Sequence, residues 1–279
     1  MTASHRPVIG IGLMITAMAV LPFLDVIAKY LGQQGVPVLQ IVWARLFFGA
    51  MMTMPLALKI AGVKGLVPNM PVMHATRACF LIAATAFFFW ALHYLPLADT
   101  LAIFFVQPLI VTLLSPLVLG EHVGIRRWAA VAVGFAGTLI IIRPGFEELN
   151  PGVLLALSSG ASLAVYLLLT RKIAGSAPAI VTTFYTSLMG AIIMSMAVVF
   201  VWETPTPAQW GLFLLLSLIA NGGHFLIIKA YDHAEASLLA PLAYTEIVMA
   251  TFAGWYFFSD FPDRWTFLGV GILIASAIY

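Results

Sequence analysis

The stretch LADTLAIFFVQPLIVTLLSPLVLG, residues 97–120, carries one charged side chain, Asp99, among its 24 residues. At 1.5 Å per residue, a helix of this length crosses the roughly 30 Å hydrocarbon core of a bilayer. Comparable apolar stretches recur along the chain, at residues 8–31, 37–58, 74–94, 125–142, 151–170, 179–202, 210–228, 236–258 and 265–279. We therefore expect an all-α membrane protein with ten transmembrane helices, because a helix satisfies its backbone hydrogen bonds within lipid.

The composition of the chain agrees with this expectation. Of its 279 residues, 62% are hydrophobic and 9% are charged, whereas soluble domains carry about 25% charged residues. The net charge of +2 comes from basic residues in short connections, which predicts contact with a lipid bilayer and no nucleic-acid partner. A single cysteine, Cys79, excludes an intramolecular disulfide, and we expect its thiol to be buried.

Basic residues in the connections predict the orientation of the chain. With the N-terminus inside, most of them fall on the inner side, namely Arg6, Lys59, Lys64, Arg77, Arg126, Arg127, Arg171, Lys172 and Lys229. The outer connections hold Arg143 and Arg264. Because cytoplasmic loops are enriched in lysine and arginine, we expect both termini in the cytoplasm.

The two halves of the chain share a short pattern. The dipeptide Arg-Trp occurs at residues 127–128 and again at 264–265, and a glycine follows six residues after each tryptophan. Five predicted helices per half is an odd number, so a duplicated half must enter the membrane in the opposite sense. The sequence therefore predicts two inverted five-helix repeats, residues 1–145 and 146–279.

Several motifs resemble the drug/metabolite transporter superfamily, in its ten-span type built from two EamA domains. They are Pro108 to Gly120 followed by Glu121 and the first Arg-Trp pair, then Ala240-Pro241, Phe258 to Pro262, and Trp265 to Gly271. Two further strings, Asp25 to Gly32 and Ala240 to Glu246, resemble the branch that contains S-adenosylmethionine and riboflavin uptake carriers. Asp260 departs from the family pattern, which commonly has glutamate at that position.

The resemblance implies a secondary transporter of a small metabolite, with no cofactor and no enzymatic activity, in a bacterial-type inner membrane. It favours uptake of a heterocyclic metabolite such as riboflavin or S-adenosylmethionine, and export of amino acids or related metabolites is the alternative within the superfamily. An intramembrane enzyme and a channel are remote alternatives, because the sequence shows neither a nucleophile–base spacing nor a filter motif. It also lacks the glycine-rich loop with lysine that binds nucleotide phosphates.

Charged side chains inside the predicted helices are candidates for transport, because charge within a bilayer is costly. Asp25 and Lys29 lie one turn apart in the first predicted helix, and Arg45 lies in the second. By helical rise, Asp25 and Arg45 lie about 9 and 12 Å from the outer ends of their helices, so the two can meet. They either form a structural ion pair or serve transport, while the amine of Lys29 is expected to extend outward to the interface.

Glu246 is the leading candidate for the transport site. About ten residues of predicted helix lie on either side of it, which places it near the bilayer midplane, where alternating-access carriers bind their substrates. It can bind a coupling proton or a cationic group of the substrate. The alternative is a neutral glutamic acid that joins two helices by a hydrogen bond.

Prolines indicate irregular backbone near two further candidates. Pro241 and Tyr244 precede Glu246 closely, and Gln107 with Pro108 occupies a comparable place in the first half. An irregular helix exposes free carbonyls to a cavity, so Tyr244 and Gln107 are candidate substrate contacts. Either proline can instead be a tolerated kink.

Other candidates are polar or aromatic. Asn221 and His224 flank two glycines that we expect to interrupt the helix at residues 210–228, although helix packing explains them equally well. No metal site is expected at His224, because no second histidine lies one turn away. Tyr166 is a candidate for stacking on a planar ring, as are Trp43 and Trp90, with packing or interfacial anchoring as the alternative. Glycines expected to pack helices together are Gly134, Gly137, Gly269 and Gly271.

Overall fold

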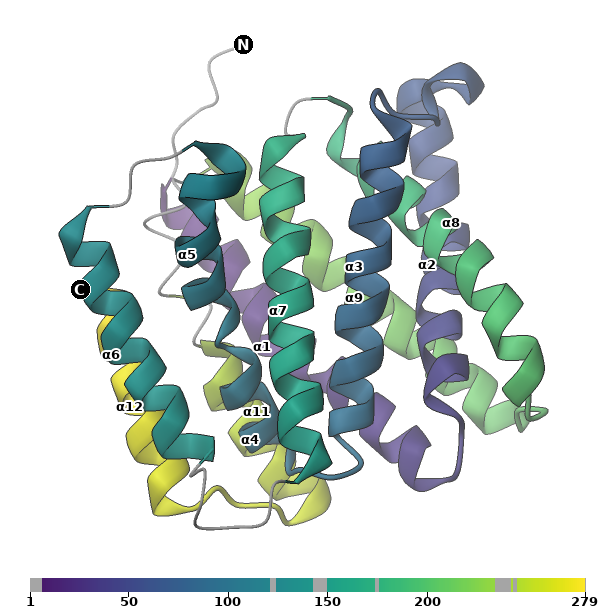
Figure 1. The fold of residues 1–279 in the computed structure, drawn as a ribbon. Helices are drawn as coiled ribbons and strands as arrows, with labels where there is room; N and C mark the ends of the chain where they lie inside the picture. The colour runs from purple at the N-terminus through teal and green to yellow at the C-terminus, as the bar shows by residue number, and fades with distance from the viewer. Residues whose placement is uncertain are drawn as a thin grey trace.

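The computed structural model describes residues 7–120, 124–142, 150–173, 176–233, 242 and 245–278. These residues are almost entirely helical, and no strand occurs among them (Figure 1). The α-helices are α1 (Pro7–Gln33), α2 (Val38–Ala61), α3 (Pro71–Ala91), α4 (Leu97–Phe104), α5 (Gln107–Leu119), α6 (Ile125–Ile142), α7 (Pro151–Lys172), α8 (Ala179–Val198), α9 (Pro207–His233), α11 (Thr245–Phe258) and α12 (Arg264–Ile278). Two short 3₁₀ turns, η1 (Val63–Gly65) and η2 (Val199–Val201), follow α2 and α8.

The all-α membrane architecture is confirmed. In the described part of the chain, 7 helical segments are long and apolar enough to cross a bilayer, namely α1, α2, α3, α4 with α5, α7, α8 with η2, and α9. The other predicted spans contain shorter helices, of 18 residues in α6, 14 in α11 and 15 in α12. The total of ten spans stays a prediction, because most of residues 234–244 lie outside the described part.

The stretch at residues 97–120 forms two helices in place of one, because the chain breaks between Phe104 and Gln107. Pro108 has no backbone N–H and so cannot donate to the carbonyl of Phe104, four residues earlier. Helix α7 packs against this break, since a Cβ added to Gly160 would lie 2.7 Å from the Phe104 carbonyl oxygen. The irregularity predicted at Pro108 is therefore confirmed, whereas Pro241 lies outside the described residues.

The packing of the helices has an internal symmetry. In order, the first five predicted spans are α1, α2, α3, α4 with α5, and α6, and the next five begin with α7 and end with α12. The most extensive helix pairs are α1 with α9, α2 with α8, α3 with α7, and α6 with α12. When each helix is replaced by the helix at the same position in the other half, the α1–α9 pair becomes the α7–α3 pair. The α2–α8 and α6–α12 pairs are unchanged by this replacement. This pattern is the one expected of two equivalent units related by a two-fold axis, and the count of five helices in each unit stays a prediction.

The edges of the bundle are formed by corresponding helices of the two halves. Figure 1 shows α6 and α12 side by side at one edge and α2 with α8 at the opposite edge. A Cβ added to Gly269 would lie 2.7 Å from the Gly137 carbonyl oxygen, so these two glycines permit the close approach of α6 and α12, as predicted. The prediction that Gly271 packs helices together in the same way was wrong, because nothing lies within 4 Å of a Cβ added to it.

The outside of the bundle is apolar, as contact with hydrocarbon requires. Large hydrophobic side chains such as Leu117, Met196 and Phe200 are 82%, 70% and 87% exposed. The free thiol of Cys79 is exposed too, so the prediction that it is buried was wrong. It occupies a lipid-facing position of α3, where a small apolar side chain is equally stable.

Candidate functional site

Arg45 of α2 joins three helices inside the bundle. Its Nη1 donates to Thr85 Oγ1 on α3 at 2.7 Å, and its Nη2 lies 3.1 Å from His224 Nε2 on α9. A guanidinium can only donate, so His224 Nε2 is the acceptor, and the imidazole is neutral with its proton on Nδ1. The predicted candidates Arg45 and His224 thus lie in direct contact, although 179 positions separate them in the sequence.

Two carboxylates, one from each half of the chain, lie beside this contact. Asp25 of α1 is 7% exposed, and it interacts electrostatically with Arg45 and with Glu246 of α11. Neither carboxylate has a hydrogen bond or an ion pair with another described residue. Two negative charges repel strongly in a medium of low dielectric constant, so a proton or a cation between them stabilises the arrangement.

The structure corrects one expectation about this region and leaves another untested. Asp25 and Arg45 do not form a direct ion pair, because the guanidinium turns to Thr85 and His224 and reaches Asp25 only through longer-range electrostatics. Glu246 lies in the first turn of α11, and its place near the centre of a span stays a prediction, because most of residues 236–244 lie outside the described part.

Arg77 is a buried residue that the sequence analysis missed. We expected it in a cytoplasmic connection, but it lies in α3 and is 2% exposed. Its Nη1 donates to Thr170 Oγ1 at 3.1 Å and its Nη2 donates to Thr186 Oγ1 at 2.5 Å. The signal was present in the sequence, since the apolar stretch predicted at residues 74–94 already contained Arg77.

Tyr166 of α7 links the two arginines. The guanidinium carbon of Arg77 lies 4.9 Å from the centroid of the tyrosine ring, a cation–π contact. Tyr166 also interacts electrostatically with Arg45, and Arg77 interacts with His224. These side chains form one group inside the bundle, here called the central polar cluster: Asp25, Arg45, Arg77, Tyr166, His224 and Glu246.

Comparison with known proteins places the chain in a family. The sequence model of the EamA-like transporter family matches residues 8–143 and again residues 150–279. The chain belongs to the EamA-like transporter family. It is therefore a membrane transporter and not an enzyme, and the two matches cover nearly its whole length.

Characterised relatives of the transporter differ in their substrates. The S-adenosylmethionine uptake transporter of Rickettsia bellii is 27% identical over 97% of this chain and 92% of its own. The riboflavin transporter of Rhizobium johnstonii is 26% identical over 98% and 91%, and the pseudopaline exporter of Pseudomonas aeruginosa is 27% identical over 86% and 84%. A crystal structure with 20% identity has a TM-score of 0.67, covers 97% of this chain and 94% of its own, and shows the same fold.

An ion pair connects the C-terminal part of α1 to the segment that follows α11. Lys29 Nζ donates to Asp260 Oδ2 at 2.5 Å and lies 4.7 Å from the centroid of the Phe258 ring. Lys29 is 8% exposed, so its amine, which was expected to extend outward to the interface, is instead buried against Asp260. Asp260 follows α11 directly, and the pair therefore joins the first half of the chain to the second.

The remaining predicted candidates either have no hydrogen bond with the central polar cluster or lie outside the described residues. Gln107 stands at the break before α5, with its Oε1 buried and without a hydrogen-bond partner among the described residues. Asn221 donates to the Ser217 carbonyl of its own helix at 2.8 Å, and its amide lies against Gly49 of α2. Helix α9 runs through Asn221 without a break, so the predicted interruption was wrong. Tyr244 lies outside the described residues.

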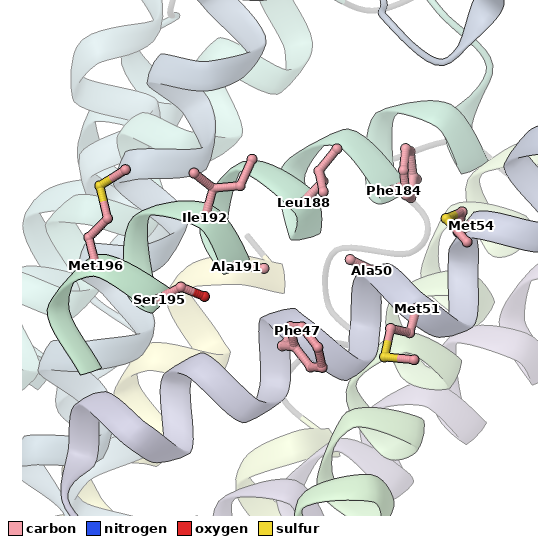
Figure 2. A pocket seen from close by; sticks show the side chains of 10 residues that line it. All are labelled: Phe47, Ala50, Met51, Met54, Phe184, Leu188, Ala191, Ile192, Ser195 and Met196. Atoms are coloured by element: carbon pink, nitrogen blue, oxygen red, sulfur yellow. The ribbon is translucent and has the colours of Figure 1, made fainter. Parts of the chain in front are cut away.

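A groove of about 470 Å³ opens between α2 and α8, and no residue of the central polar cluster lines it (Figure 2). Its lining is apolar except for one hydroxyl, and consists of Phe47, Ala50, Met51, Met54, Phe184, Leu188, Ala191, Ile192, Ser195 and Met196. The Ser195 hydroxyl already accepts a hydrogen bond from Trp43 Nε1 at 2.9 Å. Met51 and Met196 are exposed on the outside of the bundle, so the groove faces lipid and offers little to recognise a polar solute.

Neither the aromatic group around Trp43 nor a metal centre adds to the site among the described residues. Trp43 stacks on Phe47, with 4.9 Å between the ring centroids, and contacts Trp202 and Trp210 edge-on near the N-terminal end of α2, which agrees with packing and interfacial anchoring. Among the described residues, no three histidine, cysteine, aspartate or glutamate side chains gather closely enough to hold a metal ion.

Proposed function

We propose that the chain is a secondary carrier for uptake of a small heterocyclic metabolite, and that the central polar cluster is its substrate site. The observation that carries the proposal is the origin of the cluster: Asp25, Arg45 and Arg77 come from the first half of the chain, and Tyr166, His224 and Glu246 come from the second. Alternating-access carriers bind their substrates between two repeats that move against each other.

The chemistry of the cluster fits a substrate with both polar and planar parts. Asp25 and Glu246 can hold a proton or a cationic group between them, which makes a coupling proton part of the proposal. The guanidinium groups can bind acceptor atoms, and Tyr166 offers an aromatic face. The S-adenosylmethionine and riboflavin transporters among the relatives carry heterocyclic solutes, which supports this substrate class.

We further propose that the carrier lies in a bacterial inner membrane with both termini in the cytoplasm. The basic residues of the predicted inner connections support this orientation. The relatives named above come from bacteria. Export is the second candidate direction, and the pseudopaline exporter among the relatives is the observation that favours it.

The proposal is tested by counterflow in proteoliposomes that contain the purified protein. Vesicles are preloaded with one unlabelled solute and diluted into the same solute carrying a radioactive label, with S-adenosylmethionine, riboflavin and a mixture of amino acids in separate experiments. Transient, saturable accumulation of S-adenosylmethionine or riboflavin above that in protein-free liposomes supports the proposal. Accumulation of amino acids alone supports the alternative substrate class, and flux that does not saturate supports a channel.

A further inference from the structure

Arg77 is a buried cation without an acidic partner among the described residues. It lies 6 residues into α3 from Pro71, about 9 Å from the predicted inner end by helical rise. The side chains in direct contact with it, Thr170, Thr186 and Tyr166, are neutral, and two histidines, His74 and His224, interact with it electrostatically. A buried charge without a counter-ion is destabilising, so its retention calls for a function.

The hydrogen bonds of Arg77 leave one of its three nitrogens, Nε, without an acceptor among the described residues. The hydroxyls of Thr170 and Thr186 donate to the carbonyls of Tyr166 and Thr182, each at 2.7 Å, so both hydroxyl oxygens are free to accept from the guanidinium. The Thr182 carbonyl oxygen is a more distant acceptor, 3.5 Å from Nη2. The Nε–H is buried and has no acceptor. An unsatisfied buried donor is costly and is uncommon in native structures.

The orientation of the guanidinium is fixed before any ligand arrives. Thr170 and Thr186 hold its two terminal nitrogens from α7 and α8, and Tyr166 covers one of its faces. The Nε–H and Nη2 lie on one edge of the guanidinium, and a carboxylate accepts two parallel hydrogen bonds from such an edge. That contact would satisfy the unused Nε–H and replace the long contact to Thr182.

We infer that Arg77 binds the carboxylate of the transported solute, so that the carrier acts on carboxylate-bearing metabolites. The inference rests on the proposed function and narrows it. Of the two heterocyclic solutes named for the relatives, S-adenosylmethionine has a carboxylate and riboflavin has none. The carboxylate lies on Arg77, while Asp25 and Glu246 remain available for the cationic part of a zwitterion.

Access to Arg77 requires the inner end of the bundle to open. With 2% of its surface exposed, the guanidinium meets a solute only when α3 separates from α7 and α8. His74, one turn before Arg77, contacts Ser176 Oγ through Nε2 at 3.0 Å, which ties α3 to the connection between α7 and α8. The structure therefore shows the side of the site that faces the predicted cytoplasm in a closed form.

The test uses two solutes that differ by one carboxylate. Counterflow of labelled S-adenosylmethionine is measured in competition with unlabelled S-adenosylmethionine or with its decarboxylated form, for the wild-type protein and for Arg77→Gln, Arg77→Lys and Arg264→Gln. Arg264 is the matched control, because it is an exposed arginine at the start of α12 that stacks on its neighbour Trp265. If Arg77 forms a charge-assisted hydrogen bond with the carboxylate, the wild type should prefer S-adenosylmethionine over its decarboxylated form by roughly tenfold or more.

The expected result is that Arg77→Gln reduces this preference to about twofold or less, that Arg77→Lys retains part of it, and that Arg264→Gln behaves like the wild type. A wild type that transports both solutes equally well overturns the inference without any variant, so poor folding of Arg77→Gln leaves the test intact. An Arg77→Gln protein that keeps the full preference overturns it as well. A wild type that moves neither these solutes nor riboflavin overturns the proposed function, and the inference with it.

Discussion

The ion pair between Lys29 and Asp260 predicts an asymmetric response to mutation. At 2.5 Å and an effective dielectric constant of about 20, the attraction between the two charges is roughly 7 kcal/mol. The free-energy cost of removing the ammonium from water offsets most of this attraction, because the Lys29 side chain is only 9% exposed, whereas that of Asp260 is 29% exposed. Asp260→Asn leaves a buried ammonium without its partner, whereas Lys29→Met leaves a carboxylate that water still reaches.

We therefore expect Asp260→Asn to lower the free energy of unfolding by about 2–3 kcal/mol and Lys29→Met by about 1 kcal/mol or less. The double variant should resemble Lys29→Met, because the methionine removes the charge that the asparagine leaves unpaired. The assay is thermal unfolding of protein in nanodiscs, where 2–3 kcal/mol corresponds to a Tm lower by roughly 4–12 °C. Equal shifts for the two single variants, or a double variant as unstable as Asp260→Asn, would refute the reasoning.

Three further predictions follow from the packing and the charges. Gly269→Val should reduce the yield of monodisperse protein by separating α6 from α12, while Gly271→Val should not, because an added Cβ has open space at Gly271. Size-exclusion chromatography compares the two yields, and equal yields would contradict the packing of α6 against α12. Arg45→Ala should cost about 2–4 kcal/mol of stability, or fail to express, because Thr85 and His224 lose a buried partner; an unchanged Tm would contradict this. A reporter fused to either terminus should show a cytoplasmic location, and an alkaline phosphatase active at the C-terminus would exclude the inverted arrangement.

The sequence predicted the fold well because the apolar stretches decide it almost alone. Residues 97–120 could hardly be anything but membrane-spanning, and the break at Pro108 follows from the missing N–H of proline. The role of Gly137 and Gly269 in helix packing was also predictable, since small residues permit close helix approach, whereas their contact with each other was not. Each of these features depends on local chemistry, which a single sequence displays.

The site was only partly predictable because its contacts join distant parts of the chain. Asp25, Arg45, His224 and Glu246 were identified by charge or polarity at membrane depth, but the choice of partner depends on how helices rotate and pack. Arg45 turns toward Thr85 and His224, although Asp25 lay at a suitable depth for an ion pair. For the same reason, the sequence did not predict that Lys29 pairs with Asp260, which is 231 positions away.

Arg77 shows a different limit of the sequence analysis. The rule that basic residues mark cytoplasmic connections was applied to Arg77, which lies six residues into α3. At a distance of fewer than two helical turns from the helix end, the sequence alone does not show whether a residue lies in the span or in the connection. Burial by α7 and α8 decides its environment, and those helices begin 74 and 102 residues later in the chain. Only the three-dimensional structure shows that its partners are threonine oxygens and a tyrosine ring.

The most direct test of the central claim is solute uptake by proteoliposomes containing the wild type, Glu246→Gln or Glu203→Gln, measured across roughly pH 5.5 to 8. Glutamine keeps the size and hydrogen bonding of Glu246 but cannot ionise. Glu203 is the matched control, because it is exposed in the connection before α9, and Gln40 contacts only its backbone. If the central polar cluster is the substrate site, Glu246→Gln should lose roughly tenfold or more of the uptake rate together with its pH dependence, while Glu203→Gln should match the wild type. A Glu246→Gln protein with the rate and pH profile of the wild type would contradict the claim.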